Sequence, residues 1–413
     1  MVHFRNLIRD AADDGARELL RITLAAVVAA VLGAGCAGTD NRAGRVDLAK
    51  LDVGSYPTTP RTVDDVPSLS EGTLLEGIRM AEAVADTSQF DSPMLYRWQA
   101  DPIPDAATLV PLLGDAGKQV LDQHGWMAGY HASYADRPQL ANGAAPPVYS
   151  GFSILLLRFP DEAAARGAAS ALEVANWKDL ARTVAVPLPE HPDVTARYTP
   201  GTGALLADAP IGPFVVHLML EAPPEGVKTR VGYLDPVLEA EHALLPDFQP
   251  TPAAEIPALP RDPDGLLARM VTTDTAHQPP VSATFAVYGP VGALRDQPPL
   301  IRKDKLYQKW GVDRFAVSGD QHLYRLRDHQ AALDMFAEFT AESSAREHEI
   351  EADPNITDER CFQTNQPATS TPGVACRIVF DKYYTLVRAD TAISVKQKAA
   401  AQYALLAAGK PTG

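Results

Sequence analysis

The same pattern occurs twice in this chain, in SILLLRFPDEAAARGAASALE (residues 153–173) and in DQHLYRLRDHQAALDMFAEFTAE (residues 320–342). Each stretch begins as a strand that ends in an arginine, Arg158 or Arg325. Asp161 or Asp328 follows three residues later. An aspartate ahead of an alanine-rich segment is typical of a helix N-cap. The pattern therefore predicts a strand, a tight turn and a helix, in two copies.

The segments on either side repeat in the same order. Upstream, VLDQHGWMAGYHASYAD from Val120 parallels KLYQKWGVDRFAVSGD from Lys305. Downstream, the strand and helix expected at residues 214–245 parallel those expected at residues 383–406. Few residues are identical between the copies, so a chance likeness of two α+β units is the alternative. The agreement in order favours an internal duplication.

The fold class follows from the strand expected at residues 214–220, FVVHLML. Apolar side chains stand on both of its faces, which is typical of a central strand that is covered on both sides. We expect an α+β fold with two pseudo-repeated units, each an antiparallel sheet with helices packed mainly on one face. The expected boundaries are a first unit at residues 51–248, a linker with five prolines at residues 249–265 and a second unit at residues 266–413.

The N-terminus carries the pattern of an export signal. An uncharged apolar run, ITLAAVVAAVL at residues 22–32, follows two arginines and precedes three small residues and then Cys36. Such a run is too short to span a bilayer and is typical of a signal peptide. We expect a signal peptide at residues 1–35, a lipid on Cys36 and a spacer at residues 36–50, which would hold the chain on the extracytoplasmic face of the cell membrane. The alternative is an ordinary secretory signal in which Cys36 has no role.

Two further cysteines, Cys361 and Cys376, form an isolated pair at short spacing. In an exported chain such a pair indicates a disulfide. The sequences around them, RCFQT and VACRIVF, predict two strands of a hairpin that would bring the thiols together. A zinc site needs more ligands, and neither His329 nor His348 lies at zinc-like spacing from either cysteine. We therefore expect a disulfide and no metal.

Charge limits the partners of the chain. Its 413 residues carry a net charge of −15. A chain so acidic is repelled by phosphate backbones and by anionic lipid headgroups. We therefore expect no nucleic-acid partner, and a contact with the membrane only through the N-terminal lipid.

With Cys36, the LDVGSYPTTPR opening at residues 51–61, the helix pattern EGIRMAEAV at residues 76–84 and the paired repeats, the chain resembles a family of actinobacterial, mycobacterial-type cell-envelope lipoproteins of uncharacterised function. The resemblance covers nearly all of the chain after Cys36. One departure is Gly33, three residues before Cys36, where such lipoproteins usually carry leucine. The resemblance implies a location in the cell envelope and a two-part architecture. It implies no activity and no catalytic residue.

The sequence contains no motif of a serine hydrolase, a zinc protease, a P-loop or a dinucleotide-binding turn. His124 and His131 bracket the segment GWMAGY, and with Trp126 and Tyr130 they are the candidates for a pocket. Seven residues apart across a helix-to-strand turn, the two histidines need not converge. We expect structural roles for them, and no cofactor.

These observations favour a binding or scaffolding module without catalytic activity. Its partner would be an apolar ligand or an envelope protein, held on the sheets or between the units. The alternative is an envelope hydrolase or transferase whose residues meet only in three dimensions. A deep pocket with a serine or an aspartate beside His124 or His131 would favour the enzyme.

Overall fold

The computed structural model describes residues 46–86, 93–140, 143–177, 180–201, 204–222, 227–272, 278–296, 304–343, 347–365 and 372–409. The expected signal peptide, the expected lipid-attachment residue Cys36 and most of the expected spacer lie outside these ranges. Within the ranges, no helix combines the length and the apolar character needed to cross a membrane.

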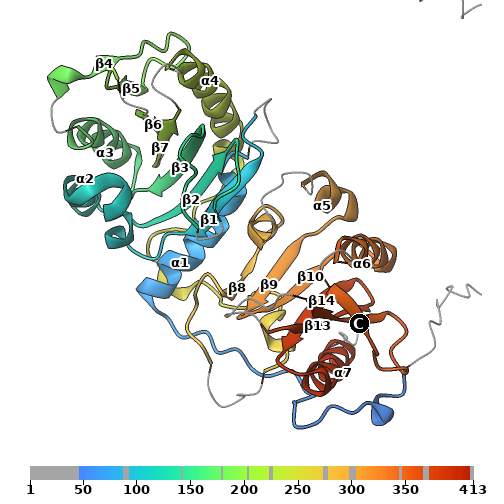
Figure 1. Ribbon diagram of the computed structural model, residues 1–413. Coiled ribbons are helices and arrows are strands. Elements are labelled where there is room, and N and C mark those ends of the chain that lie inside the picture. The colour runs from blue at the N-terminus through green and yellow to red at the C-terminus, as the bar shows by residue number, and fades with distance from the viewer. Residues whose placement is uncertain are drawn as a thin grey trace, which may run out of the picture. The chain divides into compact units, whose positions relative to one another are not determined.

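Two seven-stranded antiparallel sheets carry the fold (Figure 1). The first sheet has the strand order β1-β2-β3-β7-β6-β5-β4. Its strands are β1 (Tyr96–Pro102), β2 (Ala128–Ala135), β3 (Gly151–Arg158), β4 (Val184–Ala185), β5 (Thr195–Tyr198), β6 (Ala204–Ile211) and β7 (Phe214–Glu221).

The second sheet has the order β11-β12-β13-β14-β10-β9-β8. Its strands are β8 (Phe285–Tyr288), β9 (Arg314–Ser318), β10 (Gln321–Arg325), β11 (Glu347–Ile350), β12 (Glu359–Thr364), β13 (Val374–Phe380) and β14 (Tyr383–Ala389). Read from β8, this is the order of the first sheet with every strand number raised by seven. The predicted duplication is therefore confirmed.

The helices repeat at matching points of the chain. The second strand of each sheet follows α2 (Val110–His124) or α5 (Asp304–Trp310), and the third strand leads into α3 (Glu162–Ala175) or α6 (His329–Ser343). The last strand leads into α4 (Val227–Leu244) or α7 (Ala392–Ala408). One further α-helix, α1 (Leu69–Met80), precedes the first sheet.

Helices cover both faces of the first sheet (Figure 1). α2 and α3 pack on Leu155, Leu157 and Val215. On the other face, α4 and the end of α1 pack on Leu156 and Val216. The strand β7 thus contributes to both cores, as its apolar faces predict, and it lies between β3 and β6.

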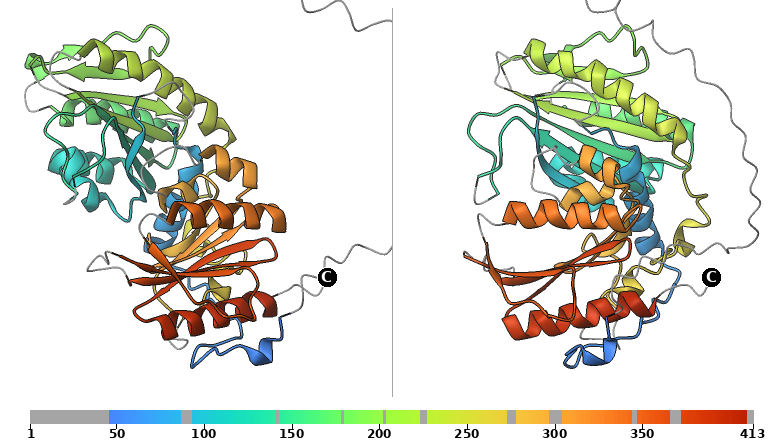
Figure 2. Two further views of the ribbon diagram at one scale, coloured as in Figure 1. Left: turned by 45° about the vertical axis from the view of Figure 1, so that its right-hand side comes forward. Right: turned by 90° about the vertical axis from the view of Figure 1, so that its right-hand side faces the viewer.

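The second sheet has the same layers (Figure 2). α5 and α6 pack on Phe315, Val317 and Tyr324. α7 packs on Ile378 and Val387 from the opposite side. In both units, then, two helices share one face of the sheet and the helix that follows the last strand covers the other face. The expected α+β fold with two pseudo-repeated units is confirmed.

The turn between the third strand and its helix is built alike in both units. The Oδ1 atom of Asp161 accepts a hydrogen bond from the backbone N–H of Ala164 at 2.8 Å, and that of Asp328 accepts one from Ala331, also at 2.8 Å. These bonds satisfy N–H groups that a helix leaves unpaired at its start. The N-caps expected from the repeated pattern are confirmed.

The expected linker, residues 249–265, packs against α1. The backbone N–H of Thr251 donates to Oε1 of Glu76 at 3.0 Å. The carbonyl oxygen of Ile256 lies where a Cβ on Gly72 would stand, 2.0 Å from that position, so only glycine fits there. The linker is therefore a fixed part of the fold.

The segment that precedes α1 packs on the second unit. Leu51, with which we expected the first unit to begin, belongs to the same core as Val395 of α7. The hydroxyl of Tyr56 lies 3.0 Å from Oγ of Ser394, the residue before Val395. Residues that precede the first sheet in the sequence thus help to cover α7.

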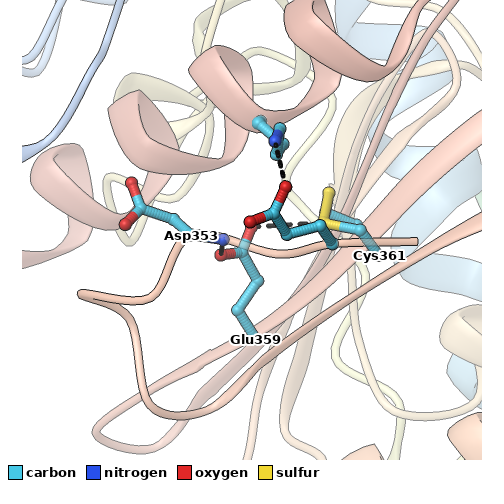
Figure 3. The surroundings of a disulfide bond; sticks show 6 residues. Asp353, Glu359 and Cys361 are labelled. Carbon is cyan, nitrogen blue, oxygen red and sulfur yellow. Dashed lines mark hydrogen bonds and ion pairs between the residues drawn. A yellow bond between two sulfur atoms is a disulfide. The ribbon is translucent and has the colours of Figure 1, made fainter. Parts of the chain in front are cut away.

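A disulfide joins Cys361 on β12 to Cys376 on β13. The two cysteines are direct cross-strand partners with Cα atoms 4.0 Å apart, and both are fully buried. Glu359 lies beside them and accepts a hydrogen bond from the backbone N–H of Asp353 at 2.9 Å (Figure 3). Burial raises the pKa of Glu359 to about 7, against the effect of that hydrogen bond. The predicted hairpin and disulfide are confirmed.

Candidate functional site

A cavity of about 180 Å³ lies on the face of the first sheet that carries α2 and α3, and we call it the first-sheet pocket. Residues of β1, β2, β3, β7, the β2–β3 connection and α2 form it. It is lined by Trp98, Gln99, Leu112, His131, Ser133, Tyr134, Gln139, Tyr149, Gly151, Phe152, Ser153, Met219 and Glu221.

Strand register explains why a polar pocket forms here. Along β3, Leu157 and Leu155 lie under α2 and α3, and the next residue on the same face is Ser153. Ser153 stands directly between Ser133 on β2 and Met219 on β7. The apolar core under the helices therefore ends at Leu155, and the row beyond it forms a largely polar floor.

His131 stands at the inner end of this floor. The residue is 6% exposed, and its Nε2 atom has no hydrogen-bond partner among the described residues. Burial lowers its pKa to about 4, while the charge of Asp101 acts to raise it and that of His217 lowers it further. At neutral pH the ring is therefore uncharged, and a buried ring nitrogen without a partner favours a ligand that supplies one.

A second histidine, His217 on β7, lies in the same row across Leu155. Its Nδ1 is 2.8 Å from Oδ1 of Asp208 on β6, and both side chains are 3% exposed. The amide of Asn176, which ends α3, donates to the other oxygen of Asp208 at 3.3 Å. This pair orients the ring of His217 and attaches the end of α3 to the sheet.

Aromatic side chains stand at the other end of the pocket. The ring centroids of Trp98 and Tyr149 are 4.8 Å apart, and the indole N–H of Trp98 donates to the carbonyl oxygen of Arg137 at 2.8 Å. The hydroxyl of Tyr149 donates to Oε2 of Glu221. Burial raises the pKa of Tyr149, as do its hydrogen bond to Glu221 and the charge of that carboxylate, so the phenol stays protonated.

The four residues considered as pocket candidates from the sequence do not converge. His131 lines the first-sheet pocket, whereas Tyr130, the next residue back along β2, points to the opposite face of the sheet. Trp126 packs on the core under α2 and α3. His124 ends α2, and its ring lies where a Cβ on Gly167 of α3 would stand.

Sequence reasoning missed the Asp208–His217 pair, although a local signal marks it. β6 and β7 are joined by Gly212 and Pro213, and Ile211 pairs with Phe214. A two-residue hairpin turn with glycine at its first position sets the register of both strands. Counting outward from the turn brings Asp208 opposite His217. Ser153 and Met219 had no such signal, because their pairing joins strands far apart in the sequence.

The polar residues in the row of Leu155, namely His131, His217 and Asp208, are not repeated at the matching positions of the second sheet. His131 pairs with Leu155, which lies three residues before Arg158. In the second sheet, Val317 pairs with His322, which lies three residues before Arg325, so Val317 is the residue that matches His131. The counterparts of His217 and Asp208, found in the same way, are Leu386 and Arg377. A site built on this row belongs to the first unit.

One group of three potential metal ligands occurs in the part of the chain that the structure describes. The ligand atoms of Glu359, Cys361 and Cys376 lie within 4.8 Å of one another. Both sulfur atoms are joined in the disulfide, so neither is a thiolate that could bind a metal. This arrangement does not fit a metal centre.

Two family models match this chain. The N-terminal model of DUF7373, a domain of unknown function, matches residues 63–261, and the C-terminal model of DUF7373 matches residues 266–409. No curated protein and no solved structure matches the chain.

Proposed function

The chain belongs to the DUF7373 family, whose two domains are of unknown function, and we propose that it is a binding module that holds a small polar molecule in the first-sheet pocket. The observation that supports this most is that His131 lines the pocket and that its buried Nε2 atom has no partner among the described residues. Leaving such an atom unpaired costs about 1 to 3 kcal/mol, which a ligand that bonds to it can recover.

Catalysis fits the same residues less well. With a pKa of about 4, His131 is a weak base at neutral pH. No hydrogen bond joins Ser133 or Ser153 to Nε2 of His131 in the described residues. A nucleophile and its base normally lie within hydrogen-bond reach of each other. Binding needs only a concave site with a few polar anchors.

A binding measurement with matched histidine variants tests the proposal. We expect small polar molecules to bind the full chain, as seen by ligand-observed NMR, and to bind His131→Leu about tenfold more weakly, because the buried polar anchor is lost. His124→Leu is the control, since His124 does not line the pocket. Equal binding by wild type and His131→Leu would contradict the proposal.

A hydrolase is the second candidate, because the hydrogen-bonded Asp208 and His217 resemble the carboxylate–histidine pair of a catalytic triad. Ser153 is a diagonal neighbour of His217 on the same face of the sheet. A fluorophosphonate probe separates the two functions, since it reacts with an activated serine. Labelling of the wild type that is lost in both Ser153→Ala and His217→Ala would favour the hydrolase, and we expect no labelling.

We also propose that the chain is exported and held on the extracytoplasmic face of the cell membrane by a lipid on Cys36, as a cell-envelope lipoprotein. Its support is the apolar run at residues 22–32, followed by small residues and Cys36. Metabolic labelling with a tagged fatty acid tests the tether. We expect label in the wild type and none in Cys36→Ala, and equal labelling of both would contradict it.

A further inference from the structure

We infer that the ligand of the first-sheet pocket is one uncharged sugar ring, a pyranose, that rests on Trp98 and bonds to the polar floor. This inference rests on the proposed binding function and names its ligand class. A free sugar and the end of a glycan chain present the same ring, so either could supply it.

The charges of the lining argue against an anionic ligand. No lysine or arginine is among the lining residues, and His131, with its pKa of about 4, is uncharged at neutral pH. One carboxylate, that of Glu221, lies in the lining and already accepts a hydrogen bond from Tyr149. A phosphate or carboxylate would enter without a cation to neutralise it, in a chain whose net charge is −15.

The polar groups of the pocket lining match hydroxyl groups. Gln99 and Gln139 each offer an amide that both donates and accepts, and Ser133 and Ser153 each offer a hydroxyl. A sugar hydroxyl also donates and accepts at once, so neighbouring hydroxyls on a ring can pair with such groups. A purely apolar ligand would leave the buried Nε2 of His131 unpaired.

The aromatic wall and the size of the pocket favour a single ring. The hydrogen bond from Trp98 to Arg137 holds the indole in place, so little side-chain freedom is lost when a ligand packs on it. The electron-rich face of an aromatic ring attracts the C–H groups of a sugar. The cavity of about 180 Å³ is smaller than the roughly 300 to 1,000 Å³ of pockets that take drug-sized ligands.

Saturation-transfer NMR on the full chain tests this inference. The probes are the methyl pyranosides of glucose, mannose and galactose, with choline as a cation, inorganic phosphate as an anion and 1-octanol as an apolar molecule. Glucose and maltotriose are compared as a free ring and a chain end. We expect at least one pyranoside to bind, and choline, phosphate and octanol not to compete with it.

Three variants locate the binding. Gln139→Ala and Trp98→Ala should weaken pyranoside binding about five- to tenfold, because each removes a contact to the ring. Gln363→Ala changes an exposed residue of β12 in the second sheet that does not line the pocket, and it should bind like the wild type. Gln139 is exposed, so its truncation leaves the fold intact and keeps the test valid if Trp98→Ala fails to fold.

The outcomes separate the ligand class from the function. If choline or phosphate binds in a manner that depends on His131 while no pyranoside binds, the sugar is wrong and the binding function stands. If octanol alone binds in that manner, the ligand is apolar and both the sugar and the proposed binding of a polar molecule are overturned. If no probe binds the wild type, both are overturned. Pyranoside binding that survives Gln139→Ala and Trp98→Ala unchanged would place the sugar elsewhere and overturn the inference.

Discussion

At the scale of single residues, some buried polar atoms have no hydrogen-bond partner among the described residues. Glu241 carries such an atom, as His131 does. Glu241 lies on α4 and is fully buried. Its Oε1 accepts a hydrogen bond from the backbone N–H of Ala85 at 2.8 Å, and its Oε2 has no partner among the described residues. Burial raises its pKa to about 8, against the effect of the Ala85 hydrogen bond.

The pKa of Glu241 predicts a pH dependence of stability. Because this pKa lies above the value of 4.5 for a free glutamate, the folded chain holds the proton more tightly than the unfolded chain does. The stabilisation is complete at low pH and is lost as pH rises through about 8. Between pH 5 and pH 9 the free energy of unfolding should fall by about 4 kcal/mol more in the wild type than in Glu241→Gln. Urea denaturation at each pH measures this, and parallel curves for the two proteins would contradict it.

The disulfide gives a second prediction at this scale. Its cysteines are separated by 15 residues, and closing a loop of that length stabilises a protein by about 3 kcal/mol in the chain-entropy model. The matching positions of the first sheet, paired in the same register, are Ala196 and Ala207. A Cys361→Ala/Cys376→Ala double variant therefore installs the pair that the first unit already has.

We expect the double variant to lose about 3 kcal/mol of unfolding free energy in urea under non-reducing conditions. Wild type with its disulfide reduced should behave like the variant. A variant as stable as the oxidised wild type would mean that the cross-link contributes nothing to the fold.

At the scale of elements, the arginines that end the third strands distinguish the two units. Arg158 is 6% exposed and pairs with the fully buried Glu76, which also accepts hydrogen bonds from Arg79 and Thr251. Arg325 lies nearer the surface, with its guanidinium 2.8 Å from Asp313 and 3.6 Å from Asp264. The side chain of Arg325 is 17% exposed, and those of Asp313 and Asp264 are 55% and 27% exposed. The same sequence pattern thus ends in a buried cluster in one unit and in partly hydrated ion pairs in the other.

This difference predicts unequal costs of removing the carboxylate. Glu76→Gln leaves a buried arginine without its counter-charge and should lower the free energy of unfolding by about 3 to 5 kcal/mol. Asp264→Asn removes a hydrated partner and should cost no more than about 1 kcal/mol. Chemical denaturation of both variants provides the comparison, and equal losses would contradict the account of the buried cluster.

The elements also show which parts of the fold the sequence could predict. The caps at Asp161 and Asp328, the central strand β7 and the cysteine hairpin depend on residues close together in the chain, so local patterns predicted them. The floor of the first-sheet pocket depends on Ser153 meeting Ser133 and Met219, and the last of these pairings is set by the register of the whole sheet. A slip of one residue would turn each of these side chains to the opposite face, so no local pattern could place them together.

At the scale of the whole molecule, the two sheets share one topology, but the polar residues His131, His217 and Asp208 occur in the first sheet alone. The strand orders of the sheets agree throughout, whereas Val317, Leu386 and Arg377 stand where the first sheet has His131, His217 and Asp208. The capping aspartates Asp161 and Asp328 recur in both units, whereas the pocket residue His131 and the Asp208–His217 pair do not. We therefore expect the second unit to support the fold and the first unit to hold the ligand.

The measurement that tests this central claim most directly is a crystal structure of the full chain soaked with a library of small polar molecules. The account predicts density for a bound molecule in the first-sheet pocket, with a polar atom within about 3 Å of Nε2 of His131. Bound molecules found only at other places, in crystals whose first-sheet pocket is open to solvent, would contradict it.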